Sequence, residues 1–215
     1  MKFLSLISAT ALVSAMCAAA PAQAAVGFAD VVIDFFDSGA GPFAGPYGGT
    51  FPGSFPVAVS TSVVLGDEPV FGIEEFLSLP TGSYVTVGFT DELIFDSAGN
   101  DIFIREAGAS GETAQIFVSN DLTTYQLLGI ANSATTTSFD LASIGFTGNV
   151  LSLRIVGLDS FGGSPGFDVV NIQAIPGSFT PSVPEPTTWG MMLLGFGILG
   201  SGLRRARQQS KAVAA

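Results

Sequence analysis

Short runs of alternating hydrophobic and polar residues recur through the middle of the chain. Tyr84–Phe89 (YVTVGF) and Ala114–Ser119 (AQIFVS) alternate with the two-residue period of a half-buried β-strand. Other apolar runs are bounded by Gly, Pro, Asn or Asp, and no long run has the 3.6-residue period of an amphipathic helix. The predicted strands are Phe28–Phe36, Val57–Leu65, Phe76–Leu79, Tyr84–Phe89, Leu93–Phe95, Ile102–Glu106, Ala114–Ser119, Tyr125–Leu128, Thr137–Leu141, Val150–Val156 and Phe167–Ile175.

Strands this short, separated by regular turn signals, are typical of an antiparallel β-sandwich. Helical segments do not alternate with the strands, and no internal repeat of fixed period is present, so α/β folds, propellers and solenoids are not expected. We predict an all-β fold, a jelly-roll-like antiparallel β-sandwich spanning residues 25–182. Residues 176–183 (PGSFTPSV) are predicted to form a short stalk after it.

One Gly/Pro-rich segment, residues 36–55, interrupts the series of strands. Its composition argues against a helix or a central strand, so we predict a surface loop or an extended crossing segment. Phe43, Tyr47, Phe51 and Phe55 recur in it at intervals of four residues. These rings either pin the segment to the sandwich, which we favour, or offer their faces to a ligand.

The N-terminus has the pattern of a secretory signal peptide. Lys2 supplies a positive charge, residues 4–20 are apolar, and Ala22-Gln23-Ala24 is an A-x-A cleavage site. We predict that residues 1–24 are removed and that the mature chain begins at Ala25.

The C-terminal stretch, residues 183–211, has three parts in order. The motif Pro184-Glu185-Pro186 comes first, then the apolar run Trp189–Leu203, and then a cluster of arginines. An aromatic residue, an apolar run and a basic end are the layout of a membrane-anchoring helix with its positive end in the cytoplasm. The run has only 15 residues and several glycines, which favours a temporary hold in the inner membrane over a permanent one.

This stretch resembles the PEP-CTERM sorting signal. The resemblance implies that an exosortase, a membrane transpeptidase, cuts near the PEP motif and passes the protein to the cell surface. It assigns residues 183–211 to sorting and anchoring and leaves residues 212–215 as a tail; an ordinary anchor helix is the alternative. The residues that match the signal are Pro184, Glu185, Pro186, Trp189, Met191, Met192, Gly195, Phe196, Gly197, Arg204 and Arg205.

The predicted sandwich is strongly acidic. It holds 17 of the 18 acidic residues but only Arg105 and Arg154 among the cations, so its net charge is 2 − 17 = −15. Such a surface repels phosphate, which excludes nucleic acid as a partner. It attracts divalent cations, or it simply keeps an exported protein soluble.

Several classes of chemistry are excluded by composition. The chain has no histidine, and its one cysteine, Cys17, lies in the signal peptide. A Ser-His-Asp triad, a Cys-His dyad and a zinc site with His or Cys ligands are therefore ruled out, and no phosphate-binding loop is present. Carboxylates are the chemistry that remains.

One loop brings oxygen ligands together. Asp96, Asn100 and Asp101 lie within it, and Glu106 follows the next predicted strand. Asp168 completes a site if the final strand returns beside this loop. Such hard oxygen ligands suit Ca²⁺, the candidate cofactor, whereas the alternative is an Asx-stabilised turn without a metal.

A second resemblance covers Val64–Ile172. The segments VLG at Val64–Gly66, Gly82–Glu106, FVSND at Phe117–Asp121 and GFDVVNI at Gly166–Ile172 are similar to galactose-binding-like β-sandwiches of cell-surface proteins. The resemblance implies a jelly-roll-like sandwich and binding of a glycan or a matrix component.

We therefore expect an exported, exosortase-processed surface or extracellular-matrix protein that is not an enzyme and that associates with exopolysaccharide. Two alternatives stay open. The sandwich is a purely structural, calcium-stiffened envelope module, or, more remotely, paired carboxylates make it a glycoside hydrolase.

Overall fold

The protein is described by a computed structural model. It describes residues 27–67, 73–107, 111–132, 137–181, 192 and 194–198, which divide after Thr180 into two units. The first unit is built from strands and two short 3₁₀ helices, η1 and η2. The elements are β1 (Val31–Phe36), β2 (Tyr47–Phe51), β3 (Val57–Ala58), η1 (Thr61–Val64), β4 (Glu74–Leu79), β5 (Tyr84–Gly88), β6 (Glu92–Ile94), β7 (Ile102–Glu106), β8 (Thr113–Ser119), β9 (Gln126–Asn132), β10 (Thr137–Phe139), η2 (Leu141–Ile144), β11 (Ser152–Gly157), β12 (Phe167–Ala174) and β13 (Phe179–Pro181).

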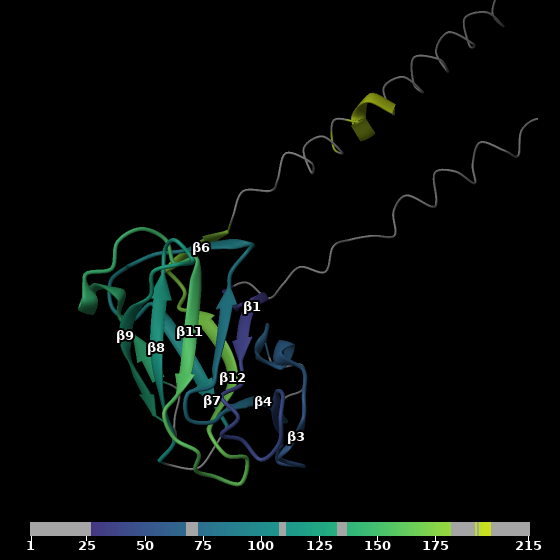
Figure 1. The fold of residues 1–215 in the computed structure, drawn as a ribbon. Coiled ribbons are helices and arrows are strands. Elements are labelled where there is room, and N and C mark those ends of the chain that lie inside the picture. Colours follow the sequence, from purple (N-terminus) through teal and green to yellow (C-terminus); the bar gives the residue numbers. More distant parts are fainter. Residues whose placement is uncertain are drawn as a thin grey trace, which may run out of the picture. The chain divides into compact units, whose positions relative to one another are not determined.

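The strands form two main sheets and one small one. The five-stranded sheet has the order β1-β5-β11-β8-β9, and four of its strands are labelled across the front of Figure 1. The six-stranded sheet has the order β10-β7-β12-β4-β2-β3 and lies behind it, while β6 pairs with β13. The strand pairs of both main sheets are antiparallel, so the predicted all-β sandwich is confirmed.

The connectivity is that of a jelly roll. Eight strands from β4 to β12, with β6 left out, pair as first with last, second with seventh, third with sixth and fourth with fifth. These pairs are β4–β12, β5–β11, β7–β10 and β8–β9. This arrangement is an antiparallel hairpin of strand pairs wrapped into two facing sheets.

The core lies between the two sheets and follows the two-residue period of the strands. In β4, Leu77 and Leu79 enter the main core, whereas Phe76 and Ser78 lie on the outer face of the six-stranded sheet. Phe76 joins Ala107 and Val170 in a second, small apolar cluster. The central strand β12 is therefore covered on both faces, and the outer one carries the site described below.

The Gly/Pro-rich segment differs from its prediction, because Tyr47–Phe51 is a strand inside the six-stranded sheet. Gly48 pairs with Leu77 of β4, and a Cβ atom at Gly48 would lie 1.9 Å from the Phe76 carbonyl oxygen. Glycine therefore permits this close pairing and does not break the strand. Tyr47 is buried and its hydroxyl donates to the Pro165 carbonyl, so this ring pins the segment as predicted.

Two other predicted elements differ from the structure. Within Val57–Leu65, only Val57 and Ala58 form a strand, and a 3₁₀ turn follows because the Ser60 side chain accepts a hydrogen bond from the Ser62 backbone N–H. Part of the predicted stalk is the strand β13, since its edge pairs with the short strand β6.

Candidate functional site

A pocket of about 260 Å³ opens on the outer face of the six-stranded sheet. The strands β2, β4 and β12 supply part of its wall, and the segments that follow β7 and precede β12 supply the rest. Its lining residues are Phe51, Phe55, Phe76, Ala107, Glu112, Gly162, Gly163, Ser164 and Asp168.

Three phenylalanines form the apolar side of the pocket. Phe76 is buried, and the ring of Phe55 meets it edge-on at a centroid distance of 5.8 Å. Phe51 lies 6.4 Å from Phe55, and these two rings are 52% and 38% exposed. Phe51 and Phe55 therefore keep part of their faces open to solvent. Of the four spaced aromatic residues, Tyr47 serves packing, whereas Phe51 and Phe55 line the pocket.

Three carboxyl groups gather at the polar side. Glu106, Glu112 and Asp168 each place an oxygen within 4.8 Å of the others, although they come from β7, the approach to β8, and β12. Asp168 is 5% exposed and Glu112 is 2% exposed. The Ser78 hydroxyl donates to Asp168 Oδ1 at 2.5 Å and lies 2.7 Å from the Ser164 hydroxyl, so the Asp168 carboxyl is held in place by its neighbours.

Burial makes two of these carboxyl groups weak acids. Burial raises the pKa of Asp168 to about 8, and the charge of Glu106 adds to this, although the hydrogen bond from Ser78 opposes it. Burial, together with the hydrogen bond and charge of Glu106, raises the pKa of Glu112 to about 9. Both groups are therefore protonated at neutral pH and can donate as well as accept hydrogen bonds.

The loop before β12 leaves room for these groups. A Cβ atom on Gly162, whose φ is +88°, would lie 2.2 Å from Glu112 Oε1. A Cβ atom on Gly163 would lie 2.9 Å from the ring of Phe55. Glycine at both positions lets the backbone approach the carboxyl and the ring closely, and keeps the pocket open.

The arrangement supplies two kinds of contact. The exposed aromatic faces can stack on the apolar face of a ring-shaped ligand. The carboxyl and hydroxyl groups beside them can form hydrogen bonds with polar groups at the edge of that ligand. A small ring with one apolar face and several hydroxyl groups fits this combination. The pocket lies just below the roughly 300–1,000 Å³ of pockets for drug-sized ligands, so it suits one such ring.

The predicted calcium ligands fall into two separate groups. Asp96 and Asp101 lie together with Asp140, whereas Glu106 and Asp168 lie together with Glu112 at the polar side of the pocket. The antiparallel pairing of β7 with β12 is the reason, because it places Asp168 near the end of β7 and the loop of Asp101 near its start.

Within the first of these groups, Asp101 has a structural role. Asp101 is fully buried, and its carboxylate accepts hydrogen bonds from Ser97 N at 2.9 Å, Ser178 Oγ at 2.7 Å and Leu141 N at 2.9 Å. It thereby joins three segments of the chain. Asn100 is exposed. Calcium binding at these residues stays a prediction.

Glu112 and the group of Asp30, Asp91 and Glu92 were not predicted from the sequence as site residues. Glu112 precedes β8 in a polar stretch, and nothing in the local pattern shows that it turns inward. A signal for Glu92 did exist, since the two-residue period of Glu92–Ile94 puts Glu92 on the same face as the buried Ile94.

The predicted terminal sites lie mostly outside the described residues. These are Ala22, Ala24 and Ala25 of the signal cleavage site, and Pro184, Glu185, Pro186, Trp189, Met191, Arg204 and Arg205 of the sorting motif. The described residues Met192 and Gly195, Phe196 and Gly197 are helical, and the Met192 and Phe196 side chains are exposed. Within the described part of the chain, no helix has the length and apolar character needed to cross a bilayer.

Comparison with known protein families assigns the C-terminal stretch to a known motif. Residues 182–208 match the PEP-CTERM protein-sorting motif. The chain carries a PEP-CTERM sorting motif. The motif implies that the protein is an exosortase target that is exported to the cell surface. No curated protein and no solved structure matches the chain, so neither comparison supplies a relative for the sandwich.

Proposed function

We propose that the sandwich is a non-catalytic glycan-binding module that attaches this PEP-CTERM protein to exopolysaccharide at the cell surface or in the matrix. One observation carries the proposal. Exposed rings of Phe51 and Phe55 and buried carboxyl groups of Glu112 and Asp168 line the same pocket, which has the size of one sugar ring.

A sugar ring is amphipathic in the way that this pocket requires. Its C–H face stacks on Phe51 and Phe55, and each such contact contributes about 0.5–1.5 kcal/mol beyond the area it buries. Its hydroxyl groups pair with the Asp168 and Glu112 carboxyls and the Ser164 hydroxyl. Binding at one pocket is then weak, and many copies of the protein on one polymer provide avidity.

Charge restricts the class of glycan. With a net charge of 2 − 17 = −15, the sandwich repels polyanions such as uronic acid polymers. Protonated carboxyls in the pocket add no charge of their own near neutral pH. We therefore infer that neutral sugars are preferred over acidic ones.

Binding is tested on the segment Ala25–Ser182 with the exopolysaccharide of the producing cell, once with Ca²⁺ and once with a chelator. Phe51→Ala is expected to weaken binding about three- to tenfold, because one stacking surface is lost. Phe36→Ala is the matched control, since Phe36 is 48% exposed and lies on β1 in the other sheet. Its binding should equal that of the wild type.

Two other results contradict the proposal, and a third extends it. Absence of retention in both buffers favours the purely structural envelope module. Equal loss in both variants excludes the pocket as the binding site. Retention that is lost with the chelator adds Ca²⁺ to the binding mechanism without removing the glycan.

A glycoside hydrolase is the remaining alternative, because carboxyls of Glu106, Glu112 and Asp168 lie close together. A retaining enzyme needs one ionised carboxylate as nucleophile, and burial raises the pKa of Glu112 to about 9 and that of Asp168 to about 8, which disfavours these two groups in that role. New reducing ends that appear on incubation with the polymer, and that disappear in Glu112→Gln, would establish hydrolysis and end the non-catalytic interpretation.

A further inference from the structure

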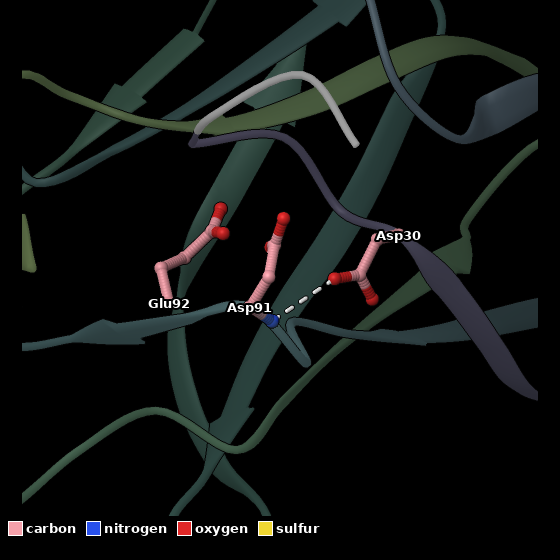
Figure 2. A group of neighbouring side chains, drawn as sticks. All are labelled: Asp30, Asp91 and Glu92. Carbon is pink, nitrogen blue, oxygen red and sulfur yellow. Dashed lines mark hydrogen bonds between the residues drawn. The ribbon is translucent and has the colours of Figure 1, made fainter. Parts of the chain in front are cut away.

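A third group of acidic side chains lies away from the pocket. Asp30 precedes β1, and Asp91 and Glu92 lie where the chain turns from β5 into β6. Each of the three offers an oxygen within 4.8 Å of the other two, and Figure 2 shows the Asp91 carboxylate between those of Glu92 and Asp30. The group therefore joins two segments about 60 residues apart in the chain, as the hydrogen bond between Thr90 and Asp30 also does.

One side of the group is held by hydrogen bonds. Asp30 Oδ2 accepts from Thr90 N at 2.8 Å, from Thr90 Oγ1 at 2.7 Å and from Asp91 N at 3.3 Å. The dashed line in Figure 2 marks the last of these. They hold the Asp30 carboxylate beside Asp91.

The inner side of the group has oxygens without partners. Glu92 is only 3% exposed, yet neither of its carboxylate oxygens has a hydrogen-bond partner. Asp30 Oδ1 and Asp91 Oδ1 are also buried without one. These buried oxygens belong to three carboxyl groups that each place an oxygen within 4.8 Å of the others, an arrangement that costs several kcal/mol unless a cation or protons compensate it.

Cationic side chains of the described residues do not provide this compensation. Arg105 pairs with Glu74 at 2.5 Å, and Arg154 lies 3.9 Å from Asp34.

We propose that Asp30, Asp91 and Glu92 form a binding site for Ca²⁺. Ca²⁺ takes six to eight oxygen ligands, so one oxygen from each of the three residues makes up about half of a shell that carbonyls and water complete. Mg²⁺ requires a stricter octahedron, and a thiol- or imidazole-seeking metal finds no such ligand here. When ionised, the three carboxylates together carry more negative charge than is needed to neutralise one divalent cation.

The position of the site indicates what the ion does. Asp30 leads into the edge strand β1, and β6 pairs with β13, the last strand before the C-terminal stretch. Phe28 and Gln173 form a bridge close by, and Phe95 N donates to Ser178 O at 2.9 Å. An ion bound here cross-links the first and last segments of the sandwich and stabilises the end where both leave it.

The test uses the full chain, purified in mild detergent and freed of metal with a chelator. Titration with CaCl₂ followed by calorimetry should detect a site with a Kd of about 10⁻⁴–10⁻³ M, the range of extracellular modules. At a tenfold excess over Kd, the Tm should rise by about 3–6 °C.

Two variants locate the effect. Glu92→Gln removes the ionisable group and keeps the shape of the side chain, so the metal-free variant should melt at or above the wild-type Tm and lose the calcium-dependent rise. Asp91→Asn should lose the rise as well. Asp140→Asn, in the group of Asp96 and Asp101, is the matched control and should keep it.

The proposal is overturned by either of two outcomes. The Tm of the wild type does not respond to Ca²⁺ at about 10 mM, well above the expected Kd. Alternatively, Glu92→Gln keeps the full rise while Asp140→Asn loses it. Neither measurement involves a glycan, so its result is separate from that of the binding experiment.

Discussion

At the scale of single residues, this protein is organised by buried carboxyl groups. Asp101 is satisfied by backbone and hydroxyl donors and joins segments of the fold. Glu112 and Asp168 are buried beside Glu106 in the pocket, and Glu92 is buried beside Asp91 and Asp30. The same residue type therefore serves structure at one position and offers ligand chemistry at others, and the surroundings of each side chain decide which.

The buried carboxyls predict an unusual dependence of stability on pH. In the fold, the pKa values of Glu92, Glu112 and Asp168 are raised to about 8, 9 and 8. The folded state thus holds more protons than the unfolded chain between about pH 4 and pH 9, so the free energy of unfolding should fall as the pH rises through this range. The contribution of these three protonated carboxyl groups to the free energy of unfolding is fully present below about pH 4 and is lost above about pH 9.

Asp168→Asn tests this at one residue. Asparagine keeps the acceptor for the Ser78 hydroxyl and cannot ionise, so the variant should be more stable than the wild type at pH 9 by a few kcal/mol and similar to it at pH 4. Urea unfolding with a chelator present measures both. The exposed Glu75→Gln on β4 is the control and should show no such crossover. Equal stabilities of Asp168→Asn and wild type at pH 9 would contradict the assignment.

At the scale of elements, the strand β2 explains how a glycine-rich segment becomes part of a sheet. Gly48 and Gly49 pair with Leu77 and Phe76 of β4, and the absence of a side chain at Gly48 lets the two backbones approach closely. The strand then carries Phe51 to the edge of the pocket. Local composition favours a loop here, but contact with β4 overrides it.

Gly48→Ala is therefore expected to destabilise the sandwich. The added methyl group would lie 1.9 Å from the Phe76 carbonyl oxygen, which belongs to the backbone and cannot rotate away. A loss of about 3 kcal/mol in the free energy of unfolding is expected. Thr50→Ala on the same strand is the control and should cost less than about 1 kcal/mol. Thermal and urea unfolding measure both; equal effects would show that β2 tolerates a side chain at Gly48.

At the scale of the whole molecule, the chain combines a sandwich with a sorting signal at residues 182–208. The motif makes the protein an exosortase target that is exported to the cell surface.

Replacement of Pro184, Glu185 and Pro186 by alanine tests the sorting step. The variant should remain in the inner-membrane fraction at its unprocessed mass, whereas the wild type reaches the surface with a smaller mass. Replacement of Thr187 and Thr188, which lie between the PEP residues and Trp189, is the matched control and should leave processing intact. Mass spectrometry of membrane and surface fractions separates the forms. Maturation of the triple variant to the wild-type mass would refute the role of the motif.

Much about this protein is determined by its sequence alone. The two-residue period of strands such as β7 and β8 depends on neighbours along the chain, so it identifies an all-β fold without a structure. The residues of the sorting motif follow one another along the chain, so the motif is recognised without knowledge of the fold. The absence of histidine and the single cysteine exclude whole classes of catalysis by composition.

The tertiary structure decided which distant residues meet. Asp168 was expected beside Asp101, but the antiparallel register of β7 and β12 places it beside Glu106 instead. Asp30 and Glu92 come together only because β1 pairs with β5 and the chain turns directly into β6. Local pattern specifies which face of a strand a side chain takes, whereas strand order and register, set by packing over the whole core, specify its partners across the sheets.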